Sequence, residues 1–153
     1  ALPGKVASAG PFYIVWPQSV GVRSEQWPFA VVRLNVRAAP DKRWPQIAVS
    51  AQVPAGDRLR RGQSLFVVQC MVCHRMNGGG DAQVGPDLNL PMNPTEYFQP
   101  HALRQLVRNP SSVRNWPTQL MPGFGPAQIS DVELDDLLAY LAHMAQQRKA
   151  APQ

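Results

Sequence analysis

Two cysteines and a histidine stand together near the middle of this 153-residue chain. Cys70 and Cys73 are separated by two residues and His74 follows directly, which gives the order Cys-x-x-Cys-His. On a helix, residues three apart share a face, so both thiols can bond to the two vinyl-derived carbons along one edge of a porphyrin. His74 can then bring an imidazole nitrogen to the iron. The pattern is the attachment signature of c-type haem and predicts one covalent haem.

Other chemistry for the two thiols fits the pattern less well. A thioredoxin-like dithiol follows a strand and begins a helix, whereas this motif comes late in a helical segment that starts near Asp57. A zinc site needs two further ligands, and the chain has no second pair of cysteines or histidines with zinc spacing. A disulfide across only two intervening residues is geometrically awkward.

The motif must be positioned by helices, and the sequence indicates three of them. The first starts at Asp57, a typical N-cap residue, and runs into the motif. The second begins at Pro100 and ends at Asn-Pro, 109–110. The third starts at the capping box Ser-Asp-Val-Glu, 130–133, and continues with leucines at i, i+3, i+4 and i+7. A Gly- and Pro-rich loop over 78–92 is too long for a simple connection, which is typical of a loop with a function.

The first half of the chain has a different pattern. Residues 12–16 are β-branched and aromatic, residues 32–36 alternate apolar and polar side chains, and residues 47–49 form a third short apolar run. Frequent prolines argue against helices in this half. We therefore predict two or three strands that pack on a larger body, since an isolated hairpin is marginal in water.

This change of pattern suggests the domain boundaries. We predict a β extension over 1–54 that packs on the haem domain, a haem domain over 55–148 and a disordered tail over 149–153. Residues 1–77 carry ten basic and three acidic side chains, and the formal net charge of the whole chain is +5, which favours acidic partners. With 44% hydrophobic residues and no apolar run near about 18 residues, the chain is neither disordered nor membrane-spanning.

The segment 55–145 resembles a class I monohaem cytochrome c. The matching pieces, in the family's order, are a helix that leads into Cys-x-x-Cys-His, Gly-Pro-Asp-Leu at 85–88, Met-Pro-Gly-Phe at 121–124, and a last helix with Leu134, Leu141 and Tyr140. The resemblance covers roughly 90 residues. It implies a mainly α fold, with three to four helices around one haem and the small β extension in front of them.

The resemblance also implies roles for single residues. His74 would be the proximal ligand of the iron, with its imidazole oriented by the carbonyl of Pro86. Met121 would be the distal ligand, since a soft thioether suits low-spin iron and raises its reduction potential. Trp116 would contact the haem or a propionate through its indole N–H, or be ordinary core. Gly62 on the first helix would permit a close crossing with the last.

Several other side chains compete for the distal position. Met92 is the main rival of Met121, because it lies on a flexible loop between two prolines. The segment after Met121 closes directly into the capped last helix, which favours Met121. His101 and His143 could each supply a second imidazole, although a lone histidine on a helix is more often surface or core.

Iron with both axial positions filled has no place for a substrate, so the resemblance implies an electron carrier and not an enzyme. We expect redox proteins as donor and acceptor, docked near the exposed haem edge, and no nucleic acid. Four arginines near the motif are candidates for contact with an acidic partner: Arg58, Arg60, Arg61 and Arg75. The alternative is a haem subunit of a molybdenum- or sulfur-oxidising enzyme, or a haem protein that binds small molecules when Met121 is labile.

The N-terminal half suggests a class of partner. Residues 10–17 and 26–29 resemble an extension found before some bacterial cytochrome c domains, and distantly resemble the closing strands of molybdopterin-dependent oxidoreductase domains. We therefore expect this extension to help dock a molybdenum-type dehydrogenase. Because the family attaches its haem on the oxidising side of a membrane, we expect a periplasmic protein. The sequence starts at Ala1, with neither an initiator Met nor an export leader. Such a start is expected either after removal of an export signal or at the beginning of an expressed fragment.

Overall fold

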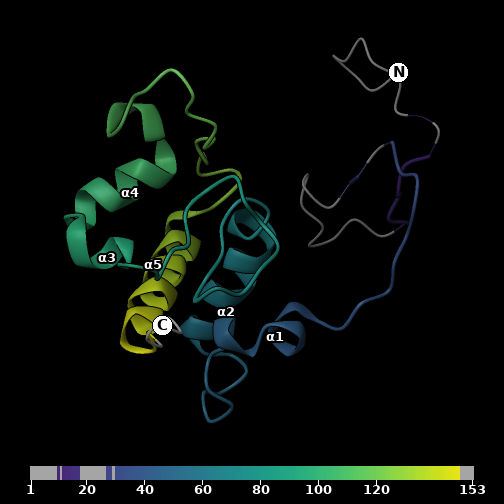
Figure 1. The fold of residues 1–153 in the computed structure, drawn as a ribbon, viewed down its shortest axis with the longest axis horizontal. Coiled ribbons are helices and arrows are strands. Elements are labelled where there is room, and N and C mark those ends of the chain that lie inside the picture. Colours follow the sequence, from purple (N-terminus) through teal and green to yellow (C-terminus); the bar gives the residue numbers. More distant parts are fainter. Residues whose placement is uncertain (1–9, 11, 18–26, 29, 149–153) are drawn as a thin grey trace. The chain divides into compact units, whose positions relative to one another are not determined.

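The computed structural model describes residues 10, 12–17, 27–28 and 30–148 (Figure 1). The chain forms two compact units, 1–38 and 39–153, and all helices of the described residues lie in the second. The α-helices are α1 (Pro40–Arg43), α2 (Arg58–Leu65), α3 (Pro94–Tyr97), α4 (Pro100–Arg108) and α5 (Asp131–Gln146). A π-helical turn, η3 (Phe66–Cys70), continues α2, and two 3-10 turns are η2 (Pro45–Ile47) and η4 (Pro110–Ser112). Within the described ranges, no helix is long and apolar enough to pass through a bilayer.

Helices α2 and α5 form the centre of the helical unit and pack against each other (Figure 1). Asp57 caps α2, and its carboxylate accepts a 2.8 Å hydrogen bond from the N–H of Leu59. Ser130 and Glu133 form the capping box that starts α5. These are the caps that the sequence predicts, and each binds backbone N–H groups that the first turn of a helix leaves without partners.

The two central helices cross most closely at Gly62. A Cβ atom added there would lie 2.7 Å from Cβ of Tyr140, with the backbone carbonyl oxygen of Asp136 closer still. The rings of Phe66 and Tyr140 pack with their centroids 5.5 Å apart. The Tyr140 hydroxyl donates a 2.7 Å hydrogen bond to the carbonyl oxygen of Ile47, which joins the chain before α2 to α5. The predicted crossing of the first and last helices is therefore present.

One hydrophobic core fills the helical unit. Its buried side chains come mainly from the segment before α2, from α2 with η3, and from α5: Ile47, Val49, Leu65, Phe66, Leu134, Leu137, Tyr140, Leu141 and Met144. The short helix α3 also packs on α5. Thus α5 contacts the helices on both sides of the long loop, and this positions the loop relative to the motif.

The strands predicted over 12–16 and 32–36 are wrong, because neither segment forms a strand in the described residues. Between the described residues of this unit, backbone hydrogen bonds run from Ile14 to Pro28 at 3.0 Å and from Val31 to Phe12 at 2.8 Å. The alternating apolar side chains are 74–101% exposed: Val32, Leu34 and Val36. A pair of segments with no buried face does not hold a ladder in water. The described part of the extension is therefore irregular and not β.

The third predicted strand, 47–49, is also absent, and its residues serve the helical core instead. Ile47 ends η2, and both Ile47 and Val49 are buried, with exposed fractions of 0% and 4%. Periodicity does not distinguish a short strand from any other short buried run, which explains the error. Residues 39–54, which the sequence pattern groups with the extension, lie in the same compact unit as the helices. The tail predicted at 149–153 lies outside the described residues.

Candidate functional site

Both cysteines lie where the π-helical turn η3 ends. The N–H groups of Cys73 and His74 donate to the carbonyl oxygen of Cys70 at 3.0 and 2.8 Å, so the three residues share one tight turn. Both thiols are free of disulfides. Burial raises the pKa of the Cys70 thiol to about 12, and the neighbouring Cys73 adds to the shift. A neutral, desolvated thiol is the opposite of the activated thiolate that a redox dithiol needs.

The imidazole of His74 is held by the loop that follows the motif. Its Nδ1 atom lies 2.8 Å from the carbonyl oxygen of Pro86. Since a carbonyl oxygen can only accept, Nδ1 carries the proton and Nε2 keeps its lone pair for a metal. Gly85 packs against the ring, and a Cβ atom at this position would lie 2.5–3.0 Å from three ring atoms. The loop therefore sets both the tautomer and the position of the imidazole.

Backbone and side-chain bonds fasten this loop to the motif. Two backbone hydrogen bonds run from the loop to the motif region: Gly85 to Cys73 at 2.7 Å and Leu88 to Arg75 at 2.8 Å. The carboxylate of Asp87 accepts from four backbone N–H groups: Asn77, Gly78, Asn89 and Leu90. This organising role of Asp87 is not among the roles expected from the sequence. An Asp in a Gly- and Pro-rich loop is a signal for such bonds, because its short side chain readily binds nearby backbone N–H groups.

The candidates for the distal side lie in two other segments. Met121 is half-buried in the irregular stretch between η4 and α5. Phe124, just beyond it, is tied to α4 through its backbone N–H at 3.0 Å and its carbonyl oxygen at 2.9 Å. Met92 stands before α3 with 49% of its surface exposed, and Trp116 is 47% exposed.

A protein-family model described as Cytochrome c matches residues 59–145, more than half of the chain. The chain belongs to the cytochrome c family. Cys70 and Cys73 have the spacing for covalent haem c, and the single Cys-x-x-Cys-His makes this a monohaem c-type cytochrome. The family implies haem-based electron transfer between redox partners, the work of an electron carrier rather than an enzyme. No solved structure gives a significant match to the chain.

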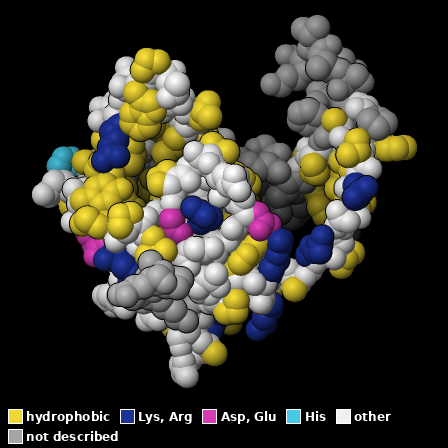
Figure 2. Space-filling view, in the orientation of Figure 1, with side chains coloured by type: hydrophobic (Ala, Val, Ile, Leu, Met, Phe, Trp, Pro, Cys, Tyr) yellow, Lys and Arg dark blue, Asp and Glu magenta, His cyan; other side chains and the backbone are white. Residues whose placement is uncertain are grey.

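The cytochrome domain exposes apolar side chains of the kind that a porphyrin needs. From the motif to Met121, six large apolar side chains are 47–75% exposed: Val72, Val84, Met92, Tyr97, Trp116 and Leu120. Figure 2 shows hydrophobic side chains gathered on the surface over α3 and α4. A bound porphyrin needs apolar walls and a few placed polar groups. These exposed side chains, two free thiols and an oriented imidazole therefore fit the haem.

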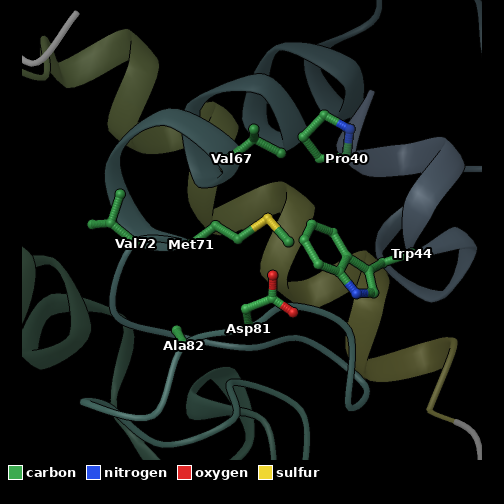
Figure 3. A pocket seen from close by; sticks show the side chains of 7 residues that line it. All are labelled: Pro40, Trp44, Val67, Met71, Val72, Asp81 and Ala82. Carbon is green, nitrogen blue, oxygen red and sulfur yellow. The ribbon is translucent and has the colours of Figure 1, made fainter. Parts of the chain in front are cut away.

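An open cavity of about 400 Å³ lies beside the attachment turn (Figure 3). Its walls come from α1, η3 and the loop after the motif: Pro40, Trp44, Val67, Met71, Val72, Asp81 and Ala82. The thioether of Met71 points toward the indole of Trp44. Arg43 connects two of the lining residues. Its guanidinium lies 2.8 Å from the carboxylate of Asp81 and 4.1 Å from the centre of the Trp44 ring. Neither cysteine nor His74 lines this cavity, so it is separate from the attachment atoms.

Three of the four arginines that the sequence suggests for a docking surface also bind groups of the domain itself. Their guanidinium groups bind α5 or the chain before α2: Arg58 the carbonyl of Asp135 at 3.0 Å, Arg60 the carbonyl of Val53 at 2.8 Å, and Arg61 the carboxylate of Asp136 at 2.7 Å. They therefore stabilise the helix crossing. Only the fourth, Arg75, has a side chain without a polar partner among the residues that the structure describes.

The zinc alternative has no support in the described part of the chain. No three His, Cys, Asp or Glu side chains gather there in a way that could hold a metal ion. His101 is exposed on α4, and His143 on α5 is half-buried. Among the described residues, neither forms such a group with the cysteines.

Proposed function

We propose that this cytochrome carries single electrons between two redox proteins, and that His74 and Met121 would hold the iron of its haem. When bound, the haem supplies a one-electron iron couple. The observation that carries the proposal is the 2.8 Å contact between Nδ1 of His74 and the carbonyl oxygen of Pro86. This contact leaves Nε2 free to coordinate, and it holds the ring in one orientation through changes of oxidation state.

Met121 is a better second ligand than Met92 on two counts. It is half-buried, whereas 49% of Met92 is exposed. The chain behind Met121 is tied to α4 through Phe124, which limits the movement of the thioether. A ligand held in place by its own segment binds with a smaller loss of chain entropy. Trp116 belongs to the same segment, and we propose that its indole closes the haem pocket next to Met121.

The optical spectrum of the ferric holoprotein tests this ligand pair. Thioether ligation produces a far-red charge-transfer band. We expect Met121→Ala to abolish this band and the matched variant Met92→Ala to retain it. If only Met92→Ala abolished the band, Met92 would be the ligand; a wild-type spectrum without the band would refute thioether ligation altogether.

Carbon monoxide separates the carrier from the alternative, a haem protein that binds small molecules. A carrier with both axial positions stably filled should form no prompt carbon monoxide adduct in the ferrous state. Prompt binding by the wild type would refute the carrier. Met121→Ala should bind carbon monoxide readily, which serves as the positive control.

We propose that the donor is a periplasmic dehydrogenase of the molybdenum type and that the acceptor is a second redox protein. Both would dock near the exposed haem edge, where Val72 and Val84 are 69% and 61% exposed. The guanidinium of Arg75 adds a positive charge for an acidic partner. A periplasmic location is consistent with thiols that must be attached to haem on the oxidising side of a membrane.

The extension would contribute to this docking through Val32, Leu34 and Val36, which are exposed and alternate with polar residues. A variant with serine at these three positions should be reduced more slowly by a purified molybdenum-dependent dehydrogenase from the same cells. Ascorbate, a small reductant that needs no docking surface, should reduce the variant and the wild type equally fast. Equal rates with the dehydrogenase would reject a docking role for these residues.

A further inference from the structure

The residue after Pro86 carries a carboxylate that is surrounded by backbone donors. Oδ1 of Asp87 accepts hydrogen bonds from three N–H groups: Asn77 at 3.1 Å, Asn89 at 2.8 Å and Leu90 at 3.0 Å. Oδ2 accepts from the N–H of Gly78 at 2.7 Å. Among the described residues, no lysine or arginine pairs with this carboxylate. Its negative charge is therefore held by backbone dipoles alone.

The turn that supplies two of these donors has an unusual backbone. Asn77 has a φ of 53° and Gly78 a φ of 75°. The N–H groups of these two consecutive residues both donate to the Asp87 carboxylate. Glycine adopts this conformation without a steric penalty, and asparagine is one of the few other residues that tolerate it. The chain directly after the motif is thus shaped to receive the Asp87 carboxylate.

We propose that Asp87 is a positioning residue for the proximal ligand. Its carboxylate bridges the segment three to four residues after His74 and the segment that follows Pro86. By joining the two, it keeps the Pro86 carbonyl oxygen 2.8 Å from Nδ1 of His74. The inference rests on the proposed function only in that it takes His74 as the ligand of the iron; it does not depend on the identity of the distal ligand.

We call the four hydrogen bonds around the Asp87 carboxylate the clamp. The clamp should affect the reduction potential in one direction only. A carbonyl oxygen that accepts from Nδ1–H makes the imidazole a stronger donor, which favours ferric iron. A fixed negative charge near the haem also favours ferric iron. Asp87→Asn removes the charge, and an amide cannot offer two acceptor oxygens to Gly78 and the other three donors. Both effects therefore predict a higher reduction potential in this variant.

A buried amide network in the same loop provides a matched comparison. The side-chain amide of Asn93 donates to Oδ1 of Asn89 at 2.8 Å and to the carbonyl oxygen of Leu141 at 2.9 Å. Both asparagine side chains are fully buried. Asn93→Ala therefore removes hydrogen bonds that tie the loop to α5, at a distance along the chain from Pro86. A substitution that affects only the stability of this loop should therefore give the same results as Asn93→Ala.

The test compares three variants of the holoprotein by spectroelectrochemical titration, thermal unfolding and NMR exchange of the His74 Nδ1 proton in the ferrous state. Asp87→Asn should raise the midpoint potential and speed this exchange several-fold. Asn93→Ala should lower Tm and change the potential and the exchange less than Asp87→Asn does, because it reaches the carboxylate only through Asn89. Asp81→Asn removes a charge from the same loop without touching the clamp, so it should raise the potential less and leave the exchange unchanged.

Two results would overturn the proposal: an unchanged potential and exchange in Asp87→Asn, or shifts no larger than those of Asp81→Asn. If Asp87→Asn does not yield folded holoprotein, Asp87→Glu provides the test instead, because it keeps the negative charge but displaces the carboxylate from its donors. It should speed the Nδ1 exchange, and wild-type exchange would refute the clamp. The far-red band is recorded in parallel, since its absence from the wild type would reject Met121 ligation and leave the test of Asp87 valid.

Discussion

The close crossing of α2 and α5 makes Gly62→Ala the most informative single substitution in the helical unit. The new Cβ would stand 2.7 Å from Cβ of Tyr140, which would have to move by about 0.7 Å to reach ordinary contact at 3.4 Å. The backbone carbonyl oxygen of Asp136 would have to move further. Because a backbone atom in the middle of α5 cannot rotate away, the helices must separate.

The expected loss of stability follows from two opposing contributions. Overpacking of a close contact costs about 1–3 kcal/mol, and the upper end applies where a backbone atom is struck. Replacing a helical glycine by alanine recovers about 0.5–1 kcal/mol through helix propensity. We therefore expect a net loss of about 2 kcal/mol in the free energy of unfolding. For a domain of this size, that corresponds to a decrease in Tm of roughly 6–12 °C.

Thermal unfolding of the ferric holoprotein, followed by far-UV circular dichroism, measures this loss. Gly56→Ala is the matched control, because a Cβ atom at Gly56 meets nothing within 4 Å. This control should unfold within a degree or two of the wild type, as expected for an exposed substitution of about ±0.5 kcal/mol. If Gly62→Ala were as stable as the wild type, or more stable by its propensity gain, the close crossing would be refuted.

Two further predictions concern the proximal ligand and the pH range of stability. In Gly85→Ala the new Cβ would lie 2.5–3.0 Å from three atoms of the His74 ring, so the imidazole must rotate and the ferric absorption spectrum should gain a high-spin component; Gly125→Ala, with nothing within 4 Å, should keep the wild-type spectrum. The pKa of Glu96 is lowered from its ordinary 4.5, first by the hydrogen bond from the backbone of Asn93 and then by Arg148. The stabilisation by Glu96 is therefore present above pH 4.5 and lost as the pH falls through its lowered value. Tm measured against pH should fall less steeply below pH 4.5 in Glu96→Gln than in the wild type, and parallel curves would contradict this assignment.

Helix boundaries and the attachment motif could be predicted because their signals are local. The Asp57 cap and the capping box at 130–133 bind N–H groups two or three residues away, so neighbouring side chains alone decide where α2 and α5 begin. The contact between Pro86 and His74, which only the family resemblance implies, is also present. The short helix α3 was not predicted, although Asn93 and Glu96 form a capping box there as well.

The strand predictions failed for the opposite reason. Alternation at Val32, Leu34 and Val36 indicates a strand only if a sheet exists for one face to pack on, and in the described residues both faces are exposed. The partners of the arginines after Asp57 could not be predicted either. Their spacing suggests a surface charge, but their partners lie some 75 residues away on α5 for Arg58 and Arg61, and a local pattern carries no information about such partners.

The sequence by itself determined the chemistry of this protein, because covalent haem attachment requires two thiols and a histidine at fixed spacing within five residues. It also determined the helices that carry them. Only the tertiary structure decided which groups hold that chemistry in place: the Gly62 crossing, the burial of Ile47 and the four backbone donors around Asp87. These depend on distances between segments that approach each other only when the chain packs, and packing is a property of the whole domain.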